Sequence, residues 1–290
     1  MDLEQLIQKI NNSHRLGEVL ETSDWKRAYR AAVMQLHPDR CVHPLAAAAL
    51  VRLNELRTIQ ERGLQLKDDA GEIRVFDDRI NFLGDPALLA LSARNYERLA
   101  CLGNPAAQHF QNYLPTAVVQ HADQLVASLP GRAVPLSGRT FAAHHVCWIL
   151  SRLLEFCAWL AQEGYVHGGL HPESVWVVPK THGIVVASFY HLQRRGGLLT
   201  TIAGHYQHWY PAAVFVEKRA TSGIDVALCK RLAAYLLGDP SGTGVRLKKT
   251  QPPELVDFLL TTHADAYVGY DAFRQILAQY YPTKYHPLTS

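Results

Sequence analysis

Residues 165–192 read YVHGGLHPESVWVVPKTHGIVVASFYHL. Two apolar runs in this stretch, Val175–Val178 and Ile184–Ala187, flank a Pro179–Gly183 turn and predict a β-hairpin. A short apolar run and a glycine-containing loop come just before the hairpin. The stretch therefore predicts a short strand, a loop and a hairpin, in that order.

A long helix is predicted immediately upstream, from Phe141 to Gln162. Gly164 follows at a position typical of a helix C-cap. Downstream of the hairpin the pattern is again mainly helical. The apolar positions that fall on one side of the upstream helix are Val146, Leu150, Leu153, Cys157 and Leu160.

This order of elements, and the string VHGGLHPESVWV within it, resembles the catalytic loop of kinase-like phosphotransferases, in which H-G-D-x-x-x-x-N supplies a base and a metal ligand. The resemblance covers about residues 70–290 and ends in FRQILAQYYPTKYHPL, which is similar to the C-terminal helix of actinobacterial-type kinase-like proteins. It implies an α+β, bilobal protein-kinase-like domain. We expect a mixed small lobe over residues 67–140 and a mainly helical large lobe over residues 141–290.

The catalytic groups of that family are missing where the motifs align. The catalytic aspartate falls on Gly169, the metal-binding asparagine on Ser174, and the aspartate of the D-F-G motif on Ser188. The helix ALLALSARNYERLACLG resembles the one that offers a glutamate to the nucleotide-binding lysine, and Asn95 stands at the glutamate position. The segment between Lys67 and Lys180 contains no lysine.

Phosphoryl transfer depends on positioning and on magnesium held by those ligands, so their joint loss predicts a catalytically inactive pseudokinase without a cofactor. An active site could be rebuilt only by unorthodox use of Glu173, His171 or Asp225. The competing interpretation of the whole region is an unrelated α+β domain with a chance H-G-x-x-H-P-E string.

Structural landmarks of the family persist. TSGIDVALCKRLAAYLL resembles the helix that begins with a buried aspartate, so we expect Asp225 to accept backbone hydrogen bonds from the turn at residues 167–169. HWYPAAVF resembles the end of the activation segment, with Ala213 in place of the usual glutamate and Val268 in place of its arginine partner. A lone survivor of that buried pair would be costly, which explains why both are absent.

A second motif lies in residues 25–40, WKRAYRAAVMQLHPDR. Asp24 or Ser23 can cap a helix whose apolar stripe is Trp25, Tyr29, Val33 and Leu36. Pro38 disfavours helical geometry at His37 and ends that helix. Pro44 is expected to open a second helix in its first turn, and Ala49, Leu53 and Leu56 to pack it against the first.

Together with RLNELRTI about a dozen residues later, this pattern resembles the J-domain of DnaJ-type co-chaperones, a small all-α hairpin that we place at residues 1–66. The resemblance implies that the loop and the basic helix face dock on a DnaK-type chaperone ATPase and stimulate hydrolysis. The segment HRLGEVLETSDW that leads into the hairpin is compressed relative to the family, and no glycine-phenylalanine linker or zinc module follows. The residues implicated in docking are His37, Pro38, Asp39, Lys26, Arg27, Arg30 and Arg40. The competing interpretation is an ordinary hairpin in which Pro38 merely stops a helix.

Composition narrows the function classes. A formal charge of +3 on 290 residues does not indicate nucleic-acid binding. The absence of a signal peptide or of about eighteen consecutive apolar residues argues against a membrane protein and predicts a cytoplasmic location. The 15 histidines lack metal-ligand spacing, as at His144–His145, and the 5 separated cysteines predict free, mostly buried thiols.

We therefore expect a co-chaperone whose inactive kinase-like domain binds an unknown protein client or serves as a scaffold. An alternative is an active atypical phosphotransferase recruited or regulated by a chaperone. Another is a structural module with an inert hairpin. The aromatic stretch at Tyr206 and His208–Tyr210 is a candidate client contact, although such residues more often belong to a core.

Overall fold

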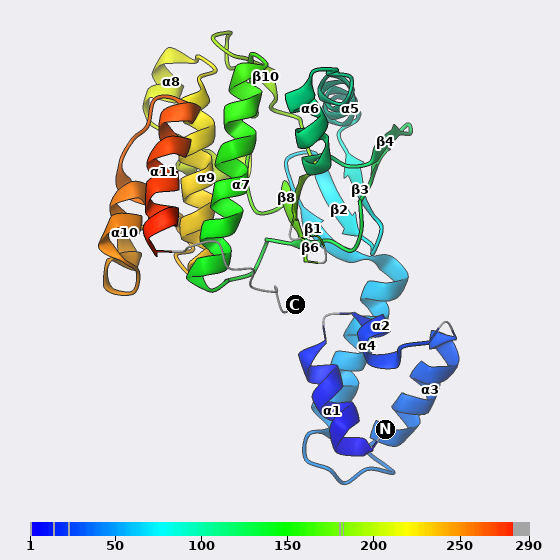
Figure 1. Cartoon of the computed structure of the whole chain (residues 1–290). Coiled ribbons are helices and arrows are strands. Elements are labelled where there is room, and N and C mark those ends of the chain that lie inside the picture. The colour runs from blue at the N-terminus through cyan, green and yellow to red at the C-terminus, as the bar shows by residue number, and fades with distance from the viewer. Residues whose placement is uncertain (1, 14, 23, 180, 182, 281–290) are drawn as a thin grey trace. The chain divides into compact units, whose positions relative to one another are not determined.

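The computed structural model describes residues 2–13, 15–22, 24–179, 181 and 183–280 (Figure 1). The chain divides into two compact units. The N-terminal unit contains the residues up to Leu66 together with Ile73–Phe76. The larger unit contains Lys67–Glu72 and the residues from Asp77 onward.

The N-terminal unit consists mainly of four helices, α1 (Leu3–Asn12), α2 (Leu16–Leu20), α3 (Trp25–Leu36) and α4 (Ala46–Arg62). Asp24 caps α3 by accepting a hydrogen bond from the backbone N–H of Arg27 at 3.2 Å, as the sequence predicts, whereas Ser23 lies outside the described residues. The buried core contains Leu6, Ile7, Ile10, Leu16, Val19, Ala32, Leu36, Ala46, Ala49, Leu53 and Leu56. The predicted stripe of α3 is buried at Leu36, while Trp25, Tyr29 and Val33 pack partly buried against this core.

The start of α4 differs from the prediction. Pro44 lies in a turn before the helix, which begins at Ala46. The backbone N–H of Leu45 donates to His43 Nδ1 at 3.2 Å, and that of Ala46 to the carbonyl of His43 at 3.0 Å. These bonds close a turn on His43, so the helix starts two residues later than a proline in its first turn would place it.

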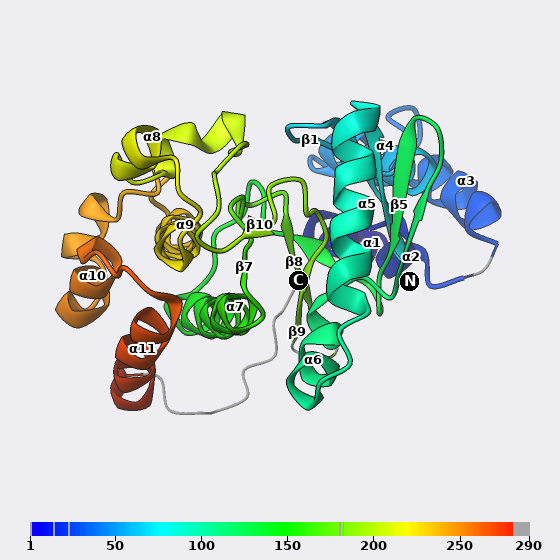
Figure 2. The same cartoon turned by 90° about the horizontal axis from the view of Figure 1, so that it is seen from above.

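Five strands form one sheet in the order β1 (Leu64–Lys67), β2 (Gly71–Val75), β3 (Arg79–Gly84), β5 (Gln124–Ser128) and β4 (Ala117–Gln120). β3 and β5 are antiparallel, with Phe82 opposite Leu125, and alternate residues of each are buried. Helix α5 (Pro86–Ala100) packs against β3, β5 and β4 (Figure 2), and α6 (Pro105–Phe110) follows it. A 3₁₀ turn, η1, spans Gln111–Tyr113.

The rest of the larger unit is mainly helical. The long helix α7 (Ala143–Gln162) packs on α9 (Ser222–Leu236) and α11 (Ala266–Tyr280). All five residues of its predicted apolar side are buried, and Gly164 ends it with a φ of 79°. The remaining helical segments are η2 (Gly204–Trp209), α8 (Ala213–Glu217), η3 (Val245–Lys249) and α10 (Pro253–Leu260).

The predicted strand, loop and hairpin lie beside α7. β7 (Tyr165–Val166) pairs with β10 (Gln193–Arg194), and β8 (Val175–Val178) pairs with β9 (Gly183–Val186) and β6 (Val134–Pro135). Trp176 at the centre of β8 is fully buried. Of the predicted C-terminal segment, residues 273–280 belong to α11 and the remainder lies outside the described residues.

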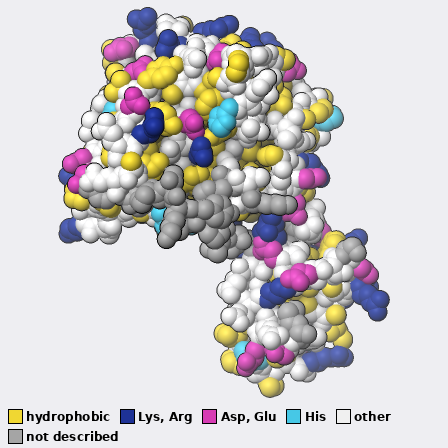
Figure 3. Space-filling view, in the orientation of Figure 1, with side chains coloured by type: hydrophobic (Ala, Val, Ile, Leu, Met, Phe, Trp, Pro, Cys, Tyr) yellow, Lys and Arg dark blue, Asp and Glu magenta, His cyan; other side chains and the backbone are white. Residues whose placement is uncertain are grey.

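Three of the five cysteines, Cys147, Cys157 and Cys229, are buried and are not joined in disulfides. Within the described ranges, no helix is both long enough and apolar enough to cross a bilayer. On the face shown in Figure 3, Lys and Arg side chains are interspersed with Asp and Glu.

Candidate functional site

The tip loop of the N-terminal unit, His37–Arg40, is open to solvent. His37 ends α3 with φ −63° and ψ 133°, an extended conformation imposed by the proline that follows. The backbone N–H groups of Arg40 and Cys41 both donate to the carbonyl of His37 at 2.9 Å, which closes the turn. The side chain of Asp39 is 86 % exposed and that of His37 is 44 % exposed.

The imidazole and carboxylate of this loop are held loosely to each other. His37 Nδ1 accepts a hydrogen bond from the backbone N–H of Asp39 at 3.3 Å and lies 3.5 Å from Asp39 Oδ2. The other polar atoms of the two side chains can hydrogen-bond to another molecule without disturbing the hydrophobic core of this unit. Pro38 and Arg40 are exposed in the same loop, and Lys26, Arg27 and Arg30 are exposed on α3.

In the larger unit, Asp225 at the start of α9 is completely buried. Its two oxygens accept hydrogen bonds of 2.8 Å from the backbone N–H groups of His167 and Gly168, the bonds expected from the sequence. Burial raises the pKa of Asp225 to about 7, although the two N–H donors oppose the rise. The Asp225 side chain therefore holds the loop after β7 in place through two backbone hydrogen bonds.

The buried imidazole of His167 holds the same loop against the segment after β9. Its Nε2 lies 3.0 Å from the carbonyl oxygen of Ser188. Burial, reinforced by the nearby histidines His191 and His171, lowers the pKa of His167 to about 3. The ring is thus neutral, and Nε2 is the nitrogen that carries the proton it donates to Ser188.

No side chain fits at Gly169, the position aligned with the catalytic aspartate. A Cβ built there would lie 2.3 Å from Cδ2 of His191 and 3.0 Å from its Cγ. The imidazole of His191 therefore occupies the space in which a side chain at position 169 would begin. The glycine at position 169 is what leaves room for the His191 ring.

Ser174 and Asn95, which also stand where the kinase motifs have other residues, form hydrogen bonds within the fold. Ser174 Oγ accepts from the backbone N–H of His171 and donates to its carbonyl, both at 2.9 Å. Asn95 on α5 donates from Nδ2 to the carbonyls of Phe189 at 2.9 Å and Leu192 at 3.3 Å. Asn95 thus joins α5 to the segment after β9 with neutral hydrogen bonds. Ser188 is buried at the start of that segment.

Two carboxylates that sequence reasoning missed, Asp68 and Asp69, lie in the short connection between β1 and β2. Asp68 accepts from the backbone N–H groups of Ala70 at 3.0 Å and Gly71 at 3.2 Å, and from the hydroxyl of Tyr190 at 2.9 Å. Burial raises the pKa of Asp68, while the bond from Tyr190 acts in the opposite direction. The turn and the segment after β9 are thereby joined.

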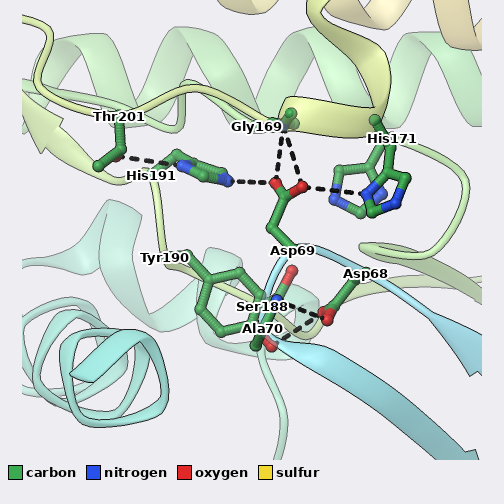
Figure 4. A network of polar contacts seen from close by, with 12 residues as sticks. Asp68, Asp69, Ala70, Gly169, His171, Ser188, Tyr190, His191 and Thr201 are labelled. Carbon is green, nitrogen blue, oxygen red and sulfur yellow. Dashed lines mark hydrogen bonds and ion pairs between the residues drawn. The ribbon is translucent and has the colours of Figure 1, made fainter. Parts of the chain in front are cut away.

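Asp69 reaches further into the site (Figure 4). One of its oxygens lies 2.9 Å from His191 Nε2, the other lies 3.2 Å from His205 Nδ1, and the backbone N–H of Gly204 donates to both. Burial alone would raise its pKa, but the bonds from His191 and His205 outweigh burial and lower the pKa to about 2. Asp69 is therefore an anion. The other ring nitrogen of His191, Nδ1, lies 3.1 Å from Thr201 Oγ1. We call Asp68, Asp69, Tyr190, His191 and Gly204 the polar network.

Glu173 makes a neighbouring cluster. It accepts hydrogen bonds from Ser137 Oγ at 2.6 Å and the hydroxyl of Tyr206 at 2.8 Å, and lies 3.1 Å from His171 Nδ1. The rings of His171 and Tyr206 stack with centroids 5.1 Å apart. Burial would raise the pKa of Glu173, but the bonds from His171, Ser137 and Tyr206 lower it. The carboxylate is therefore ionised and fully engaged.

The space left between these groups is about 110 Å³, far below the roughly 300–1,000 Å³ of ordinary ligand pockets. Its described lining combines three carboxylates, those of Asp68, Asp69 and Glu173, with the side chains of Lys67, His171, His205 and Tyr206. Among the described residues, no group of three or more His, Cys, Asp or Glu is arranged to hold a metal ion.

Within the aromatic stretch singled out from the sequence, Trp209 and Tyr210 are buried. The hydroxyl of Tyr210 accepts from the backbone N–H of Ala203 at 2.8 Å and donates to the carbonyl of Gly168. These two residues therefore belong to the core, Tyr206 belongs to the Glu173 cluster, and His208 is exposed.

Comparison with known proteins gives a result at the level of the fold. No family model and no curated protein matches the sequence. Among solved structures, the chain is similar to vaccinia related kinase 3, with a TM-score of 0.54 and 11% identity over 78% of this chain and 93% of that one. It is also similar to a Toxoplasma gondii rhoptry antigen kinase domain, with a TM-score of 0.52 and 14% identity over 76% and 83% of the two chains. The chain therefore contains a protein-kinase-like fold.

Proposed function

We propose that this chain is a J-domain-type co-chaperone that recruits and stimulates a DnaK-type chaperone ATPase. In the proposal, the kinase-like domain has no catalytic activity and binds a client protein or acts as a scaffold. The observation that carries the proposal is the solvent-exposed His37-Pro38-Asp39 loop at the end of a helix with exposed basic residues.

The chemistry of that loop supports docking on an acidic surface. Lys26, Arg27 and Arg30 are exposed on α3, and Arg40 is exposed in the loop. A cluster of this kind accelerates encounter with a partner of opposite charge more than it strengthens the final complex. His37 and Asp39 then supply directional hydrogen bonds, since neither has a partner in the unit's core.

The larger unit supports the absence of phosphoryl transfer. The polar network occupies the region beside Gly169, and the space bounded by Asp68, Asp69, His171 and Glu173 is only about 110 Å³. The groups left for unorthodox catalysis are already committed. Asp225 accepts two backbone hydrogen bonds, and the oxygens of Glu173 contact Ser137, His171 and Tyr206.

The co-chaperone role is tested by single-turnover ATP hydrolysis of a DnaK-type chaperone in the presence of the full chain. We expect the wild type to accelerate hydrolysis and Asp39→Asn to lose the acceleration. Asp123→Asn is the matched control, because Asp123 is also exposed and the substitution removes the same charge. Equal acceleration by wild type and Asp39→Asn, or none by the wild type with several such chaperones, would refute the proposal.

The client or scaffold role is tested by co-purification with the wild type, Asp39→Asn and Asp123→Asn chains. We expect the chaperone to be recovered with the wild type and the Asp123→Asn control but not with Asp39→Asn. A client bound by the kinase-like domain should be recovered with all three. If every partner depended on Asp39, the kinase-like domain would have no binding role of its own.

A further inference from the structure

A second cavity lies beside α9, and no residue of the Gly169 loop lines it. It has a volume of about 300 Å³, which falls at the lower end of the range for small-molecule sites. One wall is a face of α9 from Gly223 to Arg231. The others come from the Trp209–Ala212 turn and from the segment Leu259–His263, which leads from α10 toward α11. The cavity shares no lining residue with the space beside the polar network.

The ionisable residues that line this cavity are all basic. Lys230, Arg231 and His263 line it together with Thr261 and Thr262. Thr243 also lines it, but its hydroxyl donates to Asp239 Oδ2 at 3.1 Å. None of its described lining residues is Asp or Glu. A concave wall with cationic and hydroxyl donors and no carboxylate attracts and hydrogen-bonds oxyanions.

Lys230 is the central group. The residue is 3 % exposed, and its Nζ donates to the carbonyl of Thr261 at 2.7 Å and contacts His263 Nδ1. The same Nζ lies 4.1 Å from the centroid of the Phe258 ring. The ammonium group thus contacts a carbonyl, an imidazole and an aromatic face, and no carboxylate of the described residues lies within ion-pair distance of it.

Burying an ammonium group without a counterion is costly, and here burial lowers the pKa of Lys230 to about 7. A leucine or methionine would fill the same space at no such cost. An oxyanion entering the cavity would supply the missing countercharge. Arg231 stands next to it on the same wall, with its guanidinium 3.3 Å from the carbonyl of Gly242.

We propose that this cavity is a binding site for a small molecule carrying a phosphate or carboxylate group, with Lys230 as its principal contact. In the proposed site, His263 and the hydroxyls of Thr261 and Thr262 add hydrogen bonds. The site is separate from the proposed docking loop and from the degenerate kinase positions. A ligand there would bridge α9 and the segment between α10 and α11.

The test is isothermal titration calorimetry of the full chain with inorganic phosphate and, separately, with succinate, at constant ionic strength set by sodium chloride. We expect one of the two anions to bind with a stoichiometry of one. Saturation by phosphate alone identifies the phosphate class, and saturation by succinate alone identifies the carboxylate class. Failure of both to bind would overturn the proposal.

Lys230→Met keeps the volume of the side chain and removes its charge, and we expect it to weaken binding at least tenfold. Lys249→Met is the control, because Lys249 is exposed on η3 and does not line the cavity. Equal binding by wild type and Lys230→Met would contradict the assignment.

A measurement on the wild type guards against a variant that does not fold. In a chain with ¹³C-labelled lysine, the Lys230 methylene resonance next to Nζ should shift on titration with the binding anion. The corresponding resonance of Lys249 should stay in place. Binding that leaves the Lys230 resonance unmoved would exclude this cavity as the site.

Discussion

The exposed loop His37–Arg40 and the polar network both pair an imidazole with a carboxylate, but in opposite environments. In the loop, an imidazole and a carboxylate lie 3.5 Å apart and face solvent. In the polar network, His191 and Asp69 lie 2.9 Å apart, with side chains only 4 % and 13 % exposed. The first pair can still form hydrogen bonds with a partner molecule, whereas the second pair already forms its hydrogen bonds within the chain.

The difference follows from the surroundings of the two pairs. The loop is held by backbone bonds to the carbonyl of His37, so its side chains are not needed for folding. The polar network joins the β1–β2 turn to the segment after β9 through side chains alone. A substitution should therefore alter function without altering stability in the loop, and alter stability in the network.

The largest effect is expected when an aspartate is introduced at position 169. Gly169→Asp forces a Cβ against the His191 ring and adds a buried carboxylate, and should lower the free energy of unfolding by about 3 kcal/mol without creating kinase activity. Urea unfolding measures the loss. Gly103→Asp is the control, because nothing lies within 4 Å of a Cβ at that glycine. Equal stability of the two variants would show that position 169 is not packed as described.

The next effect concerns the anion of the network. Asp69→Asn removes the charge that binds His191 and His205 and should cost about 2 kcal/mol of unfolding free energy near neutral pH. Because folding lowers the pKa of Asp69 to about 2, its contribution is complete above its ordinary value of 3.8 and is lost as the pH falls from there toward 2. The stability gap between wild type and variant should narrow over that window. A gap that is constant with pH would refute the charge-based explanation.

A smaller effect is expected at the hydrogen bond between Tyr190 and Asp68 in the network. Tyr190→Phe removes the hydroxyl that donates to Asp68 and should cost about 1 kcal/mol, measured by urea unfolding. Tyr267→Phe, at an exposed position, should change stability by less than about 0.5 kcal/mol. Equal effects of the two substitutions would mean that the Tyr190 bond contributes no stability.

The smallest effect on stability belongs to the N-terminal unit. Arg27→Gln should change the free energy of unfolding by less than about 0.5 kcal/mol, yet slow association with a DnaK-type chaperone several-fold at low salt. Stopped-flow binding at two salt concentrations measures this, and the difference should shrink at high salt. Arg246→Gln, which removes an exposed charge from η3, is the control. A rate independent of Arg27 would remove the steering role from the proposal.

Much of the fold could be predicted because its local signals agree with its final environment. The apolar side of α7 and the hairpin of β8 and β9 carry clear periodicity and turn signals, and the structure contains both. The backbone bonds to Asp225 could be expected because a buried carboxylate requires donors. The start of α4 could not, because the His43 turn competes with the helix for the same backbone groups.

The polar network had no comparable signal. Asp68 and Asp69 are 122 positions from Tyr190 and His191, and two adjacent aspartates before Ala70 and Gly71 read as a solvated turn. Their meaning arises only when the fold brings the β1–β2 turn against the segment after β9. Gly169 was predicted to stand where the kinase family has its catalytic aspartate, and the histidine ring that packs against it became visible only in three dimensions.

If the kinase-like domain is inactive as proposed, the chain's own side chains occupy the region in which a kinase holds its nucleotide. The direct test of this claim is the thermal unfolding of the wild type with and without magnesium and ATP, ADP or GTP, beside an active kinase as a positive control. A ligand at a hundred times its dissociation constant would add about 2.7 kcal/mol of stability. We predict no change in Tm for this chain, whereas a rise that requires magnesium and is abolished by substitutions lining the Gly169 region would contradict the claim.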